Sequence, residues 1–219
     1  MARTANETRD KLIASGQRLF AEQGAFRAPL RLVVDQAGQK NASALHYHFG
    51  GREGLLQAII EHHNESIETE RAEMLAALRN DEQTTDIPAL VRSVILPFAR
   101  KLDTADGREF LRIIAQLSDL FDAWQLESPQ TPAQAQAAFI MLAAALDELP
   151  AEVRHERVTM FLMLVSNALA LRARQIELGR TLHVSAEAFI ANLIDMSVGA
   201  LQARSTDASV TDAVLSADH

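Results

Sequence analysis

The chain has 219 residues, a formal net charge of −8 and no cysteine, which excludes a disulfide framework and a thiolate metal site. Apolar residues make up 48% of the chain and charged residues 23%, with only nine Gly and six Pro. This composition favours helices, and the length suffices for one or two domains with a sizeable core.

The charge is unevenly distributed along the chain. Residues 1–55 contain eight Arg or Lys and five Asp or Glu, a net charge of +3, whereas the rest contains 13 basic and 24 acidic residues, a net charge of −11. A small basic module on an acidic body can bind phosphate locally without adhering to it elsewhere.

No segment predicts export or a membrane span. Arg3 has no apolar run behind it, so the start of the chain does not read as a signal peptide. The most apolar windows, 137–146 and 158–171, are shorter than the roughly 20 residues that a spanning helix needs. We therefore expect a soluble, cytoplasmic protein.

The first two helices are predicted from apolar spacing and from the residues that end them. Helical periodicity covers about 6–23, where Gly24 follows as a stop. Pro29 suits the first turn of a second helix over 30–37, which Gly38 ends.

A brief third helix follows and ends near Phe49. Leu45 and Phe49 are four residues apart, so they share one face and can be buried together. Its other faces are polar, as expected of a helix that lies in a DNA major groove, and we interpret it as the recognition helix of a helix-turn-helix. Tyr47, the only tyrosine, is interpreted as a DNA contact or as a half-buried structural residue. The candidate contacts in this stretch are Lys40, Asn41, Ser43, Ala44, His46, Tyr47 and His48, the first few of which could also form a solvated turn.

A long fourth helix is expected over 52–78, and the polar segment 81–86 is the predicted break between a head and a body. The last helix should begin at Ser185 as its N-cap. No strand pattern appears, so the fold class is all-α, with a three-helix head (1–51), a helical body (52–204) and a disordered tail (205–219). Four or five body helices are expected, near 87–102, 107–121, 132–149, 151–178 and 185–203.

Several segments within the first 60 residues match a known family in both residue type and spacing. They are LFAEQGAF at 19–26, AG at 37–38, LHYHF at 45–49, and Arg52 with Leu55 and Leu56. On these residues the chain resembles the TetR (tetracycline-repressor) family of one-component regulators, while its body resembles the family only in helical architecture and length. The resemblance implies a homodimer, double-stranded operator DNA as a partner, a small-molecule pocket in the body, and a phosphate contact from Arg52.

Two features depart from the family pattern. Pro29 stands where the family usually has a Thr, so that hydroxyl contact to phosphate is missing. Between Gly38 and Phe49 the chain has one residue more than usual, which alters the turn before the recognition helix.

Candidate ligand contacts lie on the apolar faces of the body helices. Aromatic and Met side chains at helical spacing either line a cavity or form ordinary core. Arg112 and Gln116, four apart, and Asn167 are polar residues within apolar faces, and they either orient a ligand or satisfy a neighbouring helix or subunit. The candidates are Phe110, Arg112, Gln116, Trp124, Met141, Met163 and Asn167.

Neither a metal nor an enzymatic site is predicted. His46 and His48 diverge on a helix, as do the adjacent His62 and His63, and no carboxylate completes a metal-ligand pattern. No Gly-rich phosphate loop or nucleophile elbow is present, and no cofactor is expected. The remaining alternative to a regulator is a helical ligand-binding or interaction protein without a DNA role.

The last two helices are apolar on more than one side. We expect one side to pack on the body and the other to form a four-helix bundle with a second copy of the chain, unless the body covers both. The sequence therefore predicts a dimeric transcriptional regulator, a repressor released from its operator by a small molecule. The apolar rows comprise Val158, Phe161, Leu162, Val165, Leu169 and Ile176, then Phe189, Leu193, Met196 and Ala200, then Ile190, Ile194 and Leu201.

Overall fold

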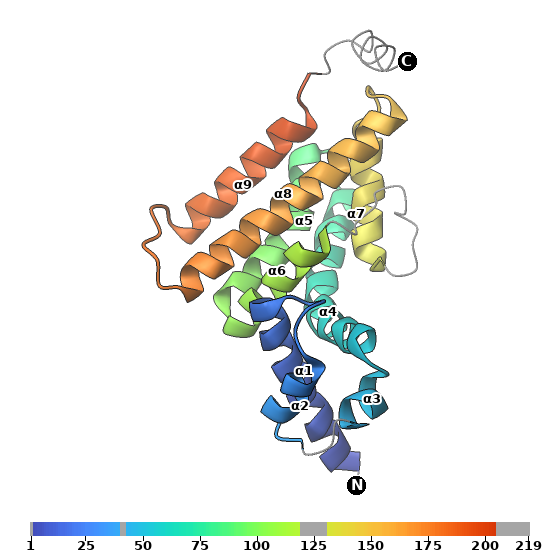
Figure 1. The fold of residues 1–219 in the computed structure, drawn as a ribbon. Coiled ribbons are helices and arrows are strands. Elements are labelled where there is room, and N and C mark those ends of the chain that lie inside the picture. Colours follow the sequence, from blue (N-terminus) through green and yellow to red (C-terminus); the bar gives the residue numbers. More distant parts are fainter. Residues whose placement is uncertain (1, 40–42, 119–130, 205–219) are drawn as a thin grey trace, which may run out of the picture.

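The computed structural model describes residues 2–39, 43–118 and 131–204, and the side chains from residue 6 onward (Figure 1). Over these ranges the chain forms nine α-helices and one 3-10 helix and no strand, which confirms the all-α fold class. No helix among the described residues is long and apolar enough to cross a membrane. The helices are α1 (Ala2–Gln23), α2 (Leu30–Gln36), α3 (Ser43–Phe49), α4 (Arg52–Asn80), α5 (Ile87–Ala99), the 3-10 helix η1 (Arg100–Asp103), α6 (Ala105–Leu117), α7 (Ala133–Ala144), α8 (Ala151–Glu177) and α9 (Ala186–Leu201).

The predicted helix stops and caps are confirmed where the signal is local. Gly24 and Gly38 follow α1 and α2 with φ of 100° and 69°, the left-handed region that glycine enters without a steric penalty. Ser185 caps α9 by accepting a hydrogen bond from the Ala188 N–H at 3.1 Å.

Two body helices are shorter than the sequence predicted. The α5 helix ends at Ala99, and the 3-10 helix η1 follows it directly. Thr104 then has an extended backbone, and its hydroxyl caps α6 by accepting a hydrogen bond from the Gly107 N–H at 3.2 Å. The α7 helix ends at Ala144, because the following hydrogen bonds join residues three apart, such as Leu149 N–H to Leu146 O.

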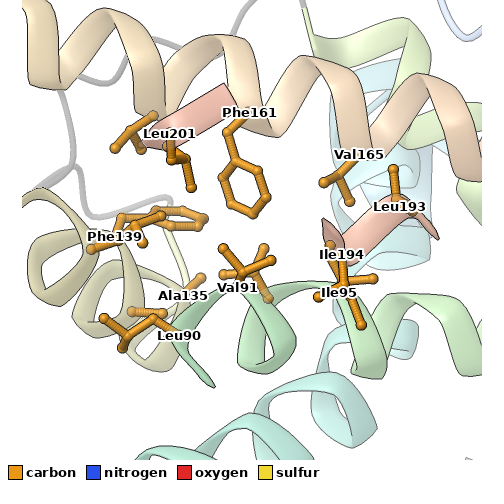
Figure 2. Close-up of a cluster of buried hydrophobic side chains, with 14 of the residues drawn as sticks. Leu90, Val91, Ile95, Ala135, Phe139, Phe161, Val165, Leu193, Ile194 and Leu201 are labelled. Atoms are coloured by element: carbon orange, nitrogen blue, oxygen red, sulfur yellow. The ribbon is translucent and has the colours of Figure 1, made fainter. Parts of the chain in front are cut away.

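Two buried clusters organise the molecule. The head cluster joins α1, α2 and α3 with the first turns of α4, and it also contains Ile113 of α6, with Leu117 packed against it. The body cluster joins the end of α4 with α5, η1, α6, α7, α8 and α9. Figure 2 shows side chains of α5, α7, α8 and α9 converging in this second cluster, including Val91, Phe139 and Phe161.

The body covers most of the apolar rows that the sequence assigned to α8 and α9. These helices lie side by side on one side of the body (Figure 1), and Phe161, Val165 and Leu193 are buried within the chain itself. Of the rows named from the sequence, only Met196 and Ala200 are exposed, so the expectation of a whole exposed row among them is wrong. The large exposed apolar side chains of these helices are instead Met160, Met163, Leu171, Leu178 and Met196.

Candidate nucleic-acid interface and apolar cavity

The α3 helix is held to the head by two side chains of unequal burial. Leu45 is 3% exposed within the head cluster, as predicted. Phe49 is only half-buried, and the Arg9 guanidinium lies 5.5 Å from the centre of its ring. The anchor is therefore Leu45 first and Phe49 second.

The outer face of α3 presents polar and aromatic side chains. Tyr47 is 84% exposed and stands edge-on to the half-buried His48, with ring centres 5.1 Å apart. This exposure rules out a half-buried structural role for Tyr47 within the chain. Ser43 and His46 are also exposed and Ala44 is half-buried, while Lys40 and Asn41 lie outside the described residues.

A basic side chain beside α3 was not singled out from the sequence. Arg31 of α2 is exposed, and together with His46 it lines a surface hollow of about 380 Å³ between α2 and α3. The signal was available, because burial of Val33 and Val34 places Arg31 on another face of α2.

Arg52, which the resemblance assigned to a phosphate contact, makes hydrogen bonds within the chain. Its two terminal nitrogens donate hydrogen bonds to the carbonyls of Ala25 and Ala28, each at 2.7 Å. Its guanidinium also lies 5.5 Å from the centre of the Phe20 ring. The side chain thus ties the α1–α2 turn to the start of α4, and we assign it a structural role.

Two of the candidate ligand contacts instead join α6 to the head. Gln116 accepts a hydrogen bond from the Ala25 N–H at 2.7 Å and donates to the Phe20 carbonyl at 3.2 Å. Arg112 donates to the Ala21 carbonyl at 2.7 Å and to the Glu177 carboxylate at 2.6 Å. Both residues therefore form hydrogen bonds to neighbouring elements, which is one of the two roles that the sequence left open.

A second polar link between head and body is centred on His63 of α4. Its Nε2 lies 2.8 Å from Oε1 of Gln17 in α1, and the Gln17 amide donates to the Asp106 carbonyl of α6 at 2.8 Å. Burial, reinforced by the charge of Lys101, lowers the pKa of His63 to about 4, so this imidazole is neutral at pH 7. The sequence pattern had suggested only a metal-ligand role for His63, which it did not support.

A mainly apolar cavity of about 270 Å³ lies in the body. Helices α4, α5, α6, α7 and α8 contribute side chains to its wall. Leu111, Ile114 and Leu117 come from α6 and Ser118 from its C-cap, and further polar groups come from Asn64 and Arg71 of α4 and Ser166 of α8. The other lining residues are Ile60, Val94, Phe98, Thr131, Pro132, Ala135, Phe139, Leu162, Met163, Val165 and Leu169.

The remaining ligand candidates mostly lie away from this cavity. Met163 lines it, but Phe110 is fully buried and stacked on His63 with ring centres 4.3 Å apart. Met141 packs on the body cluster, and the exposed Asn167 donates to the Met163 carbonyl at 2.9 Å. Trp124 lies outside the described residues.

No metal centre is apparent in the described part of the chain. Within it, no three His, Cys, Asp or Glu side chains come together in a group that could hold a metal ion.

Two solved structures are similar to this chain. Among solved structures, the chain is similar to SmeT, the repressor of the multidrug efflux pump SmeDEF of Stenotrophomonas maltophilia, at 17% identity, with 89% of this chain and 91% of that chain covered and a TM-score of 0.48. It is also similar to a protein of Mesorhizobium loti described as a TetR-family transcriptional regulator, at 11% identity, with 91% and 96% covered and a TM-score of 0.37. No curated protein matches the chain.

The family follows from the head. Residues 12–59, which run from α1 through α2 and α3 into α4, match the model of "Bacterial regulatory proteins, tetR family". This segment includes the buried Leu45 and the exposed Tyr47 that the resemblance was based on. The head therefore belongs to the TetR family of bacterial DNA-binding regulators.

Proposed function

We propose that this regulator is a dimeric repressor whose affinity for its operator falls when a small molecule occupies the body cavity. The observation that carries the proposal is the position of α6. One side of this helix lines the cavity through Leu111, Ile114 and Leu117. Its other side holds the head, through Gln116, Arg112 and the Ile113 side chain in the head cluster.

The DNA-contacting surface in this proposal is the exposed face of α3 with its flanks. Tyr47 and His46 reach outward from α3, and Arg31 stands beside them on α2. Ser43, Ala44, His48, Lys40 and Asn41 complete the proposed contact set, the last two from the segment that enters the recognition helix. Phosphate contacts fix the position of such a helix, while contacts to base edges give it sequence specificity.

The dimer in this proposal forms through α8 and α9. Met160 and Leu171 of α8 recur with Leu178, the residue that follows this helix, at spacings that place them on one face, and all three are exposed. The exposed Met196 lies on the neighbouring α9. A two-fold bundle of these four helices would cover them and set two recognition helices roughly 34–36 Å apart, one per half-site.

In this proposal, residues 1–51 form the DNA-binding domain, and residues 52–204 form the domain that provides regulation and dimerisation. A ligand shifts operator affinity only by its difference in affinity for the DNA-competent and released conformations. Because α6 contacts both cavity and head, a ligand that fits only when α6 is displaced would favour the released conformation.

The test has two stages. Genomic fragments retained by the purified full-length chain are sequenced, and the recovered operator is then titrated by gel shift in the presence and absence of cavity ligands. The proposal expects a two-half-site operator and weaker binding with ligand. Failure to retain any preferred sequence would favour the alternative of a helical ligand-binding protein without a DNA role.

A further inference from the structure

One buried cation on the cavity wall has an unused hydrogen-bond donor. Arg71 of α4 is 1% exposed and lines the cavity. Its Nε donates to the Ser93 carbonyl at 3.2 Å, and its Nη1 binds the Glu68 carboxylate. Its Nη2 is buried and has no hydrogen-bond partner. A buried donor without a partner is destabilising, and an acceptor that reaches it would recover that cost.

The charge of Arg71 is already balanced within the chain. Glu68 lies in direct ion pair with it, and the other oxygen of that carboxylate accepts a hydrogen bond from the Gln134 N–H at the start of α7, at 2.7 Å. A second anion beside this pair would leave an uncompensated negative charge in an apolar site, which is costly.

The wall is equally unsuited to a cation. Among the described lining residues there is no Asp or Glu. The hydroxyls of Ser118 and Ser166 donate to carbonyls of their own helices, those of Ala115 and Met163. Among the described lining residues, Arg71 is the one with a fully buried side-chain nitrogen that lacks a hydrogen-bond partner.

We propose that the cavity binds a neutral, largely apolar molecule that presents one acceptor oxygen, such as a ketone, ester or amide carbonyl, to Nη2 of Arg71. This inference rests on the proposed function and specifies the chemical class of its effector. Nη2 has almost no accessible surface, so the guanidinium must turn slightly to expose it to the ligand. The aliphatic and aromatic wall, including Phe98 and Leu111, holds the remainder of the molecule.

The test uses ligands that match in shape and differ in one group. The full-length protein is titrated by calorimetry and ligand-observed NMR with 2-acetonaphthone, 2-ethylnaphthalene, 2-naphthoate and protonated 2-(aminomethyl)naphthalene, and with the equivalent single-ring series. The ketone should bind roughly tenfold or more tightly than the hydrocarbon, as expected for a hydrogen bond to a charged donor. The carboxylate and the ammonium should bind more weakly than the ketone.

The variant removes the donor without leaving an unpaired charge. Arg71→Met combined with Glu68→Gln keeps an amide oxygen for the Gln134 N–H and should abolish the preference for the ketone over the hydrocarbon. The control, Arg100→Met with Glu70→Gln, deletes an Arg–Glu pair in which Arg100 is exposed. It should retain the full preference.

Several outcomes would overturn the inference. They are equal binding of ketone and hydrocarbon, tighter binding of either charged ligand, no binding by any member of either series, and a ketone preference that survives in the Arg71 double variant. A ketone that binds through Arg71 without altering operator affinity would instead refute the proposed ligand response and leave the site standing. Each failure is thus distinguishable from the other.

Discussion

Breaking the hydrogen bonds between Gln116 and the head should destabilise the protein. The expected loss of stability follows from the hydrogen bonds that the neighbouring groups lose or keep. The Ala25 N–H donates a hydrogen bond to Gln116 Oε1 at 2.7 Å, and Ala25 has no exposed surface. Replacing Gln116 with Leu therefore leaves this buried N–H without an acceptor. The Phe20 carbonyl also loses a donor but keeps the Gly24 N–H at 3.0 Å. The net change is one orphaned buried N–H, which costs about 1–3 kcal/mol.

This cost should appear in two measurements on the free protein. Taking about 2 kcal/mol, amide exchange at Ala25 should speed up roughly 30-fold, since each 1.4 kcal/mol corresponds to about a factor of ten. The unfolding midpoint should fall by about 4–8 °C for a chain of this size. Gln116→Glu is the control, because it keeps an oxygen for the Ala25 N–H. Equal exchange rates at Ala25 in the Leu and Glu variants would refute the reasoning.

Four further predictions concern other parts of the molecule. Tyr47→Ala should weaken operator binding by about tenfold without changing thermal unfolding, since the side chain is 84% exposed; unchanged affinity in a gel shift would remove Tyr47 from the contact set. Arg52→Ala should lower the free energy of unfolding by about 1.5–3 kcal/mol because two carbonyls lose a charged donor, and a urea titration that finds no loss would contradict its structural role. Leu171→Glu should shift the chain toward monomer in sedimentation equilibrium at micromolar concentration, and an unperturbed dimer would exclude that face of α8. The pKa of His63 falls to about 4 in the folded chain, so below about pH 6.5 the unfolded state binds more protons than the folded state. The free energy of unfolding should therefore drop by at most about 3 kcal/mol between pH 6.5 and 4. His63→Gln should flatten that slope in urea titrations across this range, and an identical slope in both proteins would show that another group causes it.

The helix-turn-helix could be predicted because its signals are local. Gly24 and Gly38 end helices within the same short stretch that supplies their periodicity, and the four-residue spacing of Leu45 and Phe49 defines the face that α3 turns inward. The body helices were also predictable in number and order, although η1 and the early end of α7 depend on hydrogen-bond spacing that composition does not reveal.

The partners of the polar side chains could not be predicted from spacing. A guanidinium at the start of a long helix suits a phosphate or a buried carbonyl equally well, and the Ala25 and Ala28 carbonyls that Arg52 binds lie in a distant turn. Gln116 binds Phe20, 96 residues away in the sequence. Periodicity gives the face on which a residue lies but not the helix that covers it, and that is also why the exposed face of α8 was misjudged.

The presence of Ile113 in the head cluster bears on how this regulator could be re-engineered. Chimaeric repressors are designed by exchanging DNA-binding heads between bodies, and an exchange made at residue 51 would carry over α1, α2 and α3 alone. Ile113 has no exposed surface and would then face a foreign core, with Leu117 beside it. A functional transplant therefore has to move or rematch the inner face of α6 and the first turns of α4 together with the head, so the unit of exchange is discontinuous in sequence.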